Sequence, residues 1–462
     1  MRHTVAISDI HLSQLEPSDG LWMRYRQAPF VPDKELVVML DALRERVRGQ
    51  ELELILNGDI FDFDVPWIKN GKTRFPDAER DAAIGVPVMR DILHDHLAFI
   101  QALGRVLADG HTVIFISGNH DVEMTLPEIR AEVRYALLDA SFAAGAKESR
   151  DAISQRILFR AWFYLTRDGI LLEHGHQYDE TNCYRTIMQP YDNTGKNIAP
   201  TLGALTTRYF GARLGYFNPN VDESYMLSFW GYLRHWIKYY LFSSQSILKT
   251  FFVGVAKTFI NLIKDRGDVS PQRKEKNAAA AVTEAGVGRE LIDKHLALAV
   301  KPVEENTFQL LSDLGLDRIL LALLAVILAY LWAHFTNGWL EFGALVPLGL
   351  FALYGFFAPR RSSLEELWRH VQRATQDIAA TYHAQAVIFG HTHHAEGTWE
   401  NGIFYGNTGS WSAAYKDIEC TIPLTDKRPI IWLTTQDGTS ALQGGLLFWK
   451  DGKFLENQDV GA

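Results

Sequence analysis

The chain alternates short apolar runs with longer amphipathic segments. Five runs are rich in branched aliphatic side chains and end at polar turns: Thr4–Ile7, Leu52–Leu56, Val113–Ile116, Ile170–Leu172 and Ala386–Phe389. Runs of this length and composition predict buried β-strands. The segments Asp33–Arg48 and Leu93–Ala108 have the pattern of helices and lie between the early strands. The pattern therefore predicts an α/β fold.

The strand pattern stops between about Tyr178 and His383, where aromatic and apolar stretches replace it. Removing roughly two hundred residues leaves about 250, which is a reasonable size for a single domain. We therefore interpret residues 1–178 and 384–462 as one domain and residues 179–383 as a helical insertion.

Residues 229–263 of the insertion mix aromatic with basic side chains. From Trp230 to Lys276 there are nine Lys or Arg residues against three acidic ones, in a chain of net charge −9. Such a mixture at helical spacing suits a helix that lies in a membrane interface. The alternative is an amphipathic helix that packs on the protein's own core and exposes a basic face to solvent.

Two apolar stretches follow, Ile319–Phe335 and Phe342–Ala358, each of 17 residues. As helices they would be about 25 Å long, near the lower limit for crossing a hydrocarbon core of about 30 Å. They predict a membrane hairpin over residues 319–358. Because Arg318, Arg360 and Arg361 flank its outer ends, we expect those ends and the α/β domain on the cytoplasmic side. A buried helical pair or a homodimer contact is the alternative.

The composition narrows the class of protein. A chain of 462 residues with 47% hydrophobic and 22% charged residues is globular rather than disordered, and its net charge of −9 argues against a general nucleic-acid coat. Cys183 and Cys420 are the two cysteines, so neither a disulfide framework nor a thiolate zinc cluster is available. The N-terminus runs directly into a predicted strand, and we expect no signal peptide.

Polar clusters follow all five predicted strands. They contain Asp9 and His11, then Asp59 and Asp62, then Asn119, His120 and Asp121, then His174 and His176, and finally His391 and His393. Ligands of α/β proteins gather beyond the carboxyl ends of strands, so we expect one shared site. Any one cluster alone is a weak signal, because most such pairs lie in solvated loops. Mixed carboxylate, imidazole and amide ligands suit divalent ions such as Mn, Fe, Zn or Mg.

The order D-x-H, G-D, G-N-H-D, H and G-H-x-H resembles the calcineurin-like metallophosphoesterase family over roughly residues 1–178 and 383–411. The resemblance implies a β-sandwich flanked by helices and a catalytic domain formed by residues 1–178 and 384–462. It also implies two divalent metal ions, for which we favour Mn, and hydrolysis of a phosphoester or pyrophosphate bond.

The resemblance further implies a role for each site residue. It gives one ion to Asp9, His11, Asp59 and His393 and the other to Asp59, Asn119, His174 and His391, with Asp59 shared. His120 is the expected general acid and Asp121 the carboxylate that orients it. We expect Asn119, His120 and His176 to contact substrate.

The substrate is left open. Ser8–Leu12 and Gly58–Asp62 are also similar to the family branch that contains the UDP-diacylglucosamine hydrolase of lipid A synthesis. That branch has Arg where this chain has His120 and lacks the long insertion, so we assign no substrate. We expect a phosphorylated, lipidic or membrane-bound substrate. A metal-dependent nuclease or nucleotide phosphodiesterase, and a non-catalytic membrane scaffold, are the alternatives.

Overall fold

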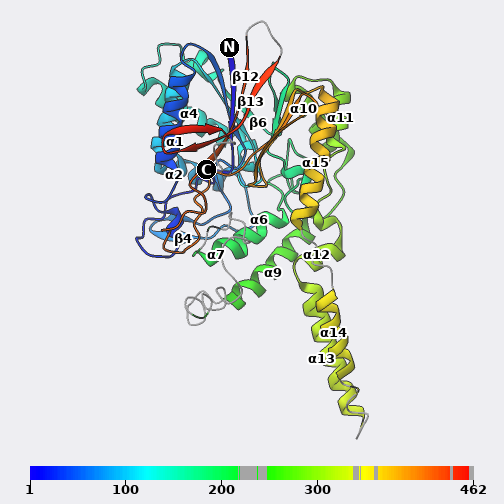
Figure 1. Cartoon of the computed structure of the whole chain (residues 1–462). Coiled ribbons are helices and arrows are strands. Elements are labelled where there is room, and N and C mark those ends of the chain that lie inside the picture. The colour runs from blue at the N-terminus through cyan, green and yellow to red at the C-terminus, as the bar shows by residue number, and fades with distance from the viewer. Residues whose placement is uncertain are drawn as a thin grey trace.

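The computed structural model describes residues 1–216, 218, 237, 247–336, 343, 345–357, 363–436 and 441–456. Much of the predicted aromatic and basic segment 229–263, and the turn between the two apolar stretches, lie outside these residues. The protein is a mixed α/β structure in which two sheets face each other and helices cover their outer faces (Figure 1).

The first sheet has seven strands in the order β14-β13-β12-β1-β2-β5-β6. Its parallel strands are β1 (Arg2–Ile7), β2 (Glu51–Asn57), β5 (Thr112–Ile116) and β6 (Ile157–Arg160). Its antiparallel side consists of β12 (Arg428–Thr435), β13 (Leu442–Lys450) and β14 (Lys453–Glu456).

The second sheet has five strands in the order β10-β11-β9-β8-β7. They are β10 (Ala395–Glu400), β11 (Ile403–Thr408), β9 (Ala386–Phe389), β8 (Ile170–Glu173) and β7 (Phe163–Leu165). Strands β8, β9 and β11 run parallel. A two-stranded ribbon, β3 (Trp67–Lys69) with β4 (Lys72–Arg74), lies apart from both sheets. All five predicted strands are therefore confirmed.

Both faces of the central strands are buried, which explains their nearly continuous apolar runs. Ala6, Ile55 and Ile114 of the first sheet belong to one core with Leu172 and Ile388 of the second. Alternate side chains of the same first-sheet strands point the other way, toward the helices on the outer face. Those helices are α1 (Asp33–Arg46), α2 (Ala82–Asp95), α3 (Leu97–Ala108) and α4 (Pro127–Ala143), and the short α5 (Arg150–Ser154) follows α4.

The predicted helix Asp33–Arg48 is confirmed almost to its end, whereas Leu93–Ala108 spans the junction of two helices. The break lies at His96, between α2 and α3. The His96 ring bonds to Asp33 at 2.9 Å through Nδ1 and to the Ser13 carbonyl at 2.8 Å through Nε2. Both ring nitrogens are therefore used in packing this corner against α1.

Part of the predicted insertion completes the sandwich. Helices α10 (Pro271–Ala285), α11 (Arg289–Leu296) and α15 (Ser363–Tyr382) cover the outer face of the second sheet. Below them lie α6 (Leu202–Thr206), α7 (Ala212–Leu214), α9 (Ile247–Asp265) and α12 (Thr307–Asp313) (Figure 1). The predicted domain boundaries stay a prediction, but the insertion supplies one of the two helical layers.

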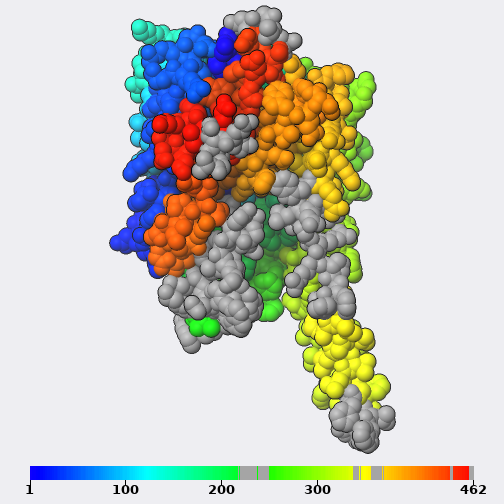
Figure 2. Space-filling view, in the orientation of Figure 1, coloured from blue at the N-terminus to red at the C-terminus, as the bar shows by residue number. Residues whose placement is uncertain are grey.

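Helices α13 (Leu316–Phe335) and α14 (Leu345–Phe357) pack on each other and project from the body (Figures 1 and 2). Within the described residues, α13 alone is long and apolar enough to cross a membrane, and 11% of its apolar window is buried. With 13 residues, α14 is shorter than a bilayer core requires. The predicted hairpin of two spanning helices is therefore corrected to one helix of spanning length with a shorter partner.

Candidate metal centre

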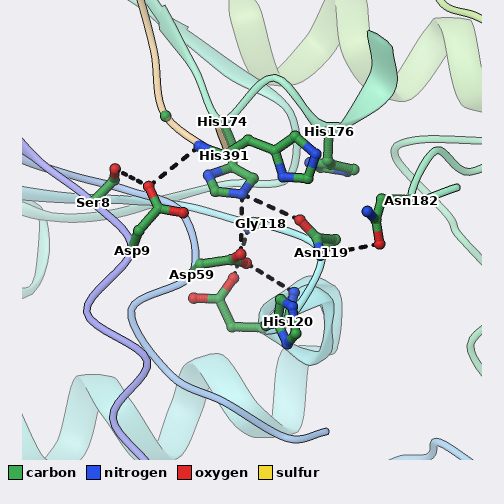
Figure 3. A network of polar contacts seen from close by, with 12 residues as sticks. Ser8, Asp9, Asp59, Gly118, Asn119, His120, His174, His176, Asn182 and His391 are labelled. Atoms are coloured by element: carbon green, nitrogen blue, oxygen red, sulfur yellow. Dashed lines mark hydrogen bonds and ion pairs between the residues drawn. The ribbon is translucent and has the colours of Figure 1, made fainter. Parts of the chain in front are cut away.

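The loops that follow β1, β2, β5, β8 and β9 meet at one edge of the sandwich (Figure 3). Parallel strands carry their following loops to the same edge, and here the two sheets bring two such sets of loops together. Hydrogen bonds from the Asp9 N–H to the Gly58 carbonyl, at 3.1 Å, and from the His11 N–H to the Asp59 carbonyl, at 3.0 Å, join the first two loops.

The backbone at this edge has an unusual conformation at the expected ligands. Asp9, His11, Asp59, His391 and His393 all have φ between 50° and 66°. This left-handed region is uncommon for residues with a side chain, although Asp and His tolerate it better than most. Sparsely populated conformations of this kind cost about 1–3 kcal/mol each and concentrate at functional sites.

Two glycines allow the loops to approach this closely. A Cβ on Gly118 would lie 2.1 Å from Asp59 Oδ1 and 2.5 Å from the Asp59 nitrogen. Gly58 has φ +86°, and a Cβ there would lie 2.4 Å from the His174 ring. Glycine beside the ligands is therefore a steric requirement as well as a conformational one.

The first group of side chains comprises Asp9, His11 and His393. His393 Nε2 lies 3.1 Å from Asp9 Oδ1 and 3.3 Å from His11 Nε2. Among the described residues Asp9 Oδ1 accepts no hydrogen bond and faces only the His393 ring, while Oδ2 accepts from the Ser8 hydroxyl and from the His391 N–H. A carboxylate oxygen and two imidazole nitrogens thus face one point.

The second group comprises Asp59, His174 and His391. His174 Nδ1 donates to the Asn57 carbonyl at 2.9 Å, and its Nε2 faces Asp59 Oδ2 and Asn119 Oδ1, each at 3.2 Å. A backbone carbonyl that fixes one ring nitrogen in this way is typical support for a metal-binding histidine, because it directs the other nitrogen into the site.

Asp59 lies between the two groups. Its Oδ2 is 3.2 Å from His174 Nε2 and 3.9 Å from His11 Nε2, while Oδ1 accepts from the His120 N–H at 2.8 Å. Burial favours the neutral carboxyl, yet the imidazoles of His174 and His120 hold the pKa of Asp59 well below its ordinary value. An ionised carboxylate that faces both groups is suited to bridge two cations.

The carboxylates of the centre favour a positive charge beside them. Burial lowers the pKa of His174, but the charges of Asp59 and Asp9 outweigh burial and raise it to about 9. Divalent cations bind to deprotonated carboxylates and neutral imidazoles and would displace that proton. The donor set and its burial fit metal ions, and Asp9 Oδ1 faces the His393 ring without a hydrogen bond.

Two residues of the predicted insertion support the second group and were not anticipated. Asp179 Oδ2 accepts from His391 Nε2 at 3.0 Å and from Asn182 Nδ2 at 2.8 Å. Asn119 Nδ2 in turn donates to Asn182 Oδ1 at 3.3 Å, which leaves the Asn119 amide oxygen toward His174. The sequence contains one indication of this role: Asp179 and Asn182 lie three and six residues after His176, just past the predicted domain boundary.

Carboxylates from the loop after β2 lie beside the His120 ring. His120 Nδ1 lies 3.4 Å from Asp62 Oδ1 and 3.2 Å from Asp64 Oδ2. Burial opposes the charged ring, but the charges of Asp62 and Asp59 outweigh it and raise the pKa of His120 well above its ordinary value. His11 also faces Asp62, at 3.7 Å. The side chains of His11, Asp62 and His120 therefore form a further group that could hold a cation.

Asp121, which we expected to orient His120, uses its oxygens elsewhere. Oδ1 accepts from the Gly118 N–H at 2.6 Å and Oδ2 from the Ile60 N–H at 2.8 Å. Burial and the charge of Asp59 raise the pKa of Asp121 to about 7. Asp121 therefore joins the loops after β2 and β5, and the carboxylates beside the His120 ring are Asp62 and Asp64.

His176 lies beside the second group, where its ring contacts those of His174, His391 and Tyr184. Its Nε2 is 2.9 Å from the Gln177 amide nitrogen, and 4% of the residue is exposed. Burial lowers the pKa of His176 well below its ordinary value. The neutral ring thus packs behind the ligands in this structure.

A cavity of about 380 Å³ opens beside the first group, between α15 and the β10–β11 hairpin. Thr392 and His394, which flank His393, lie on its wall. The other polar lining residues include Gln372, Thr375, Gln376, Glu396, Tyr405 and Asn407. No candidate ligand lines this cavity, so it lies behind the loop of His391 and His393 and outside the candidate metal centre.

No model of a protein family matches this chain, and no curated protein matches it. The clusters of His and Asp are thus the observation on which any functional assignment depends.

Proposed function

We propose that this protein is a dinuclear metal-dependent phosphoesterase of the calcineurin-like metallophosphoesterase type, and that it hydrolyses a phosphoester or pyrophosphate bond. One observation carries the proposal: two groups of imidazole and carboxylate ligands meet through the single carboxylate of Asp59. Shared carboxylates of this kind are typical of paired-metal sites that cleave phosphoesters.

Asp9, His11, Asp59 and His393 would hold one divalent ion, and Asp59, Asn119, His174 and His391 the other. Two bound ions would supply Lewis-acid charge to phosphoryl oxygens and lower the pKa of water. Manganese is the ion we favour, because oxygen and imidazole donors without thiolates suit the harder divalent metals. Asp179 and Asn182 would keep His391 and Asn119 aimed at the site.

His120 is the proposed general acid. With Nδ1 held beside Asp62 and Asp64, the other ring nitrogen is the one that can reach a leaving-group oxygen. The neighbouring carboxylates favour the protonated ring that a proton donor needs. General acid catalysis contributes about 10²–10⁴-fold. His120→Ala should therefore retain metal while its turnover falls, and loss of metal from this variant would contradict the role.

We further propose that the substrate is lipid-linked or lies at a membrane. Support comes from α13, whose residues Leu323, Val326 and Tyr330 are 56%, 57% and 67% exposed. The described part of α9 adds the exposed Phe252 and Ile260 at its surface. Apolar area of this size without a covering element is typical of membrane contact. A homodimer contact through the same helices is the alternative.

The nuclease hypothesis gains no specific support from the part of the basic stretch that the structure describes, residues 247–276. Several of its cations have partners within the protein: Lys257 pairs with Asp77, and Arg273 donates to the carbonyl of Tyr191. A surface that follows a nucleic-acid backbone needs cations free to meet phosphates. The lipid-directed proposal therefore takes precedence over the nuclease and over a scaffold without activity.

Hydrolysis of a phosphomonoester and a phosphodiester by the detergent-purified protein with added Mn tests the proposal. The parent should hydrolyse at least one ester, and Asp59→Ala should fall to background because both ions lose a ligand. Asp41→Ala removes a carboxylate that pairs with Arg44 and Arg105 at the surface and is the matched control. A parent that binds no metal and hydrolyses neither ester would favour the scaffold.

A further inference from the structure

A buried arginine from the insertion reaches the group of carboxylates beside His120. Arg208 lies in η4 (Thr207–Gly211), the turn between α6 and α7. Its side chain is 3% exposed, and its Nε donates to Asp64 Oδ1 at 2.6 Å. The other oxygen of the same carboxylate lies 3.2 Å from His120 Nδ1. Asp64 is thus held between Arg208 and the proposed general acid.

Further hydrogen bonds fix the orientation of the guanidinium. Nη1 donates to the Asp77 carbonyl at 2.6 Å, and Nη2 to the Phe63 carbonyl at 3.3 Å. The planar guanidinium presents several donors in a fixed geometry, so it restrains the direction of the Asp64 carboxylate as well as its charge. A lysine at this position could supply the charge but not this set of bonds.

A second buried arginine does not replace Arg208. Arg80 forms a bidentate pair with Glu123, with both N–O distances at 2.8 Å, and its closest approach to Asp64 is 3.9 Å. Arg80 is therefore matched to another carboxylate. Arg208 supplies the short hydrogen bond to Asp64.

The turn that carries Arg208 is packed against the helices that lead to the apolar pair. Tyr209 is buried in one cluster with Leu262 of α9 and with Leu310 of α12, and Leu316 at the start of α13 packs on the same cluster. Asn261 of α9 also donates to the Tyr209 hydroxyl at 3.3 Å. The position of Arg208 thus depends on the insertion.

We propose that Arg208 is a positioning residue that holds Asp64 against the His120 ring, so that the insertion completes the proton-donating part of the active site. This inference rests on the proposed phosphoesterase function. Arg208 touches neither the candidate ligands nor the reacting bond, and it acts through Asp64 and His120.

Leaving-group dependence separates this role from a merely structural one. A general acid matters most when the leaving group is a poor one, because a good leaving group departs without a proton. The substrates would be a 4-nitrophenyl ester and an alkyl ester of the class, phosphomonoester or phosphodiester, that the parent hydrolyses. Their hydrolysis by the full-length, Mn-loaded protein would be compared for the parent, Arg208→Met, Arg208→Lys and His120→Ala. Arg289→Met, which removes a surface arginine paired with Glu275 and Asp293, is the control.

We expect Arg208→Met to keep its metal content and to lose about tenfold or more in kcat on the alkyl ester, with a clearly smaller loss on the nitrophenyl ester. His120→Ala should show the same bias, and Arg289→Met should match the parent. Arg208→Lys should lie between the parent and Arg208→Met. If Arg208→Met does not fold, the same comparison is made with Arg208→Lys, whose kcat should fall more on the alkyl ester than on the nitrophenyl ester.

Equal losses on the two esters, or rates like those of Arg289→Met, would overturn the positioning role. A metal-loaded parent that hydrolyses no phosphomonoester, phosphodiester or pyrophosphate would instead be a failure of the proposed function itself. The two failures are therefore distinguishable.

Discussion

The closest steric constraint at the centre, Gly118, yields a sharp prediction. In Gly118→Ala the new Cβ would lie 2.5 Å from the Asp59 nitrogen, whereas real contacts of this kind stay above 3.0 Å. The two loops must therefore separate by at least about 0.5 Å. The Asp59 backbone cannot swing away as a flexible side chain would, and the hydrogen bond from the Gly118 N–H to Asp121, at 2.6 Å, opposes a simple slide of the loop.

The size of the effect follows from this displacement. Overpacking of a dense site costs about 1–3 kcal/mol of folding free energy. Changes to groups that support metal ligands lower metal affinity about 10–100-fold. Gly118→Ala should therefore bind Mn about 10–100-fold more weakly although every proposed ligand is retained.

Calorimetric titration of the metal-free protein with Mn measures this change, and thermal unfolding reports the fold. Gly288→Ala is the matched control, because a Cβ on Gly288 meets nothing within 4 Å. A Gly118→Ala protein that binds Mn within twofold of the parent would refute the claim that close packing of Gly118 holds Asp59 in place.

Three further predictions concern other parts of the molecule. Asn182→Ala should weaken Mn binding about tenfold or more, because the Asn119 amide loses the contact that orients it. An Mn affinity equal to that of the parent would contradict the supporting role of Asn182. Val326→Arg should move protein from carbonate-washed membranes into the supernatant, because a charge at the centre of a spanning helix costs about 2.5–3.5 kcal/mol. The control Val326→Ala should stay bound to the membranes. Equal retention of both variants would exclude α13 as a spanning helix. Burial raises the pKa of Glu304 to about 7, above that of an unfolded carboxyl group, so its contribution to stability is present at low pH and is lost as the pH rises through about 7. The melting temperature of Glu304→Gln should therefore rise relative to that of the parent between pH 5 and pH 8. A difference in melting temperature that does not change with pH would refute the raised pKa of Glu304.

The strands were predictable because both faces of the central strands are buried. Such strands read as continuous apolar runs, and the polar residues after them stand out. The convergence of Asp9 and His391 was predictable for the same reason, since each follows a strand whose end faces one edge of the sandwich. Most of the candidate ligands could therefore be predicted from the residues that directly follow each strand.

Supporting contacts were not predictable, because they join residues that are distant along the chain. Asp64 and Arg208 are 144 positions apart, and no pattern in either segment indicates the other. We expected Asp121 to contact His120 because it is the next residue in the sequence, but its carboxylate bonds to the backbone. Asp62 and Asp64 lie beside the His120 ring instead, and they come from another loop.

The insertion shows the limits of periodicity. An amphipathic pattern indicates that a helix has an apolar face but not which surface covers that face. Helices α10 and α15 pack on the second sheet, and no pattern in their sequences indicates that surface. For the second helix of the pair, the described residues form α14 over Leu345–Phe357, and both ends of the predicted stretch Phe342–Ala358 lie outside them.

The number of metal ions needed for hydrolysis decides whether this protein is a dinuclear phosphoesterase. Metal-free protein would be titrated with Mn while the initial rate on the preferred ester is recorded. We expect no activity without metal and a rate that rises until two ions are bound per chain, because Asp59 faces both ligand groups. Saturation at one ion per chain, or two bound ions with no hydrolysis of any phosphoester or pyrophosphate offered, would contradict this expectation.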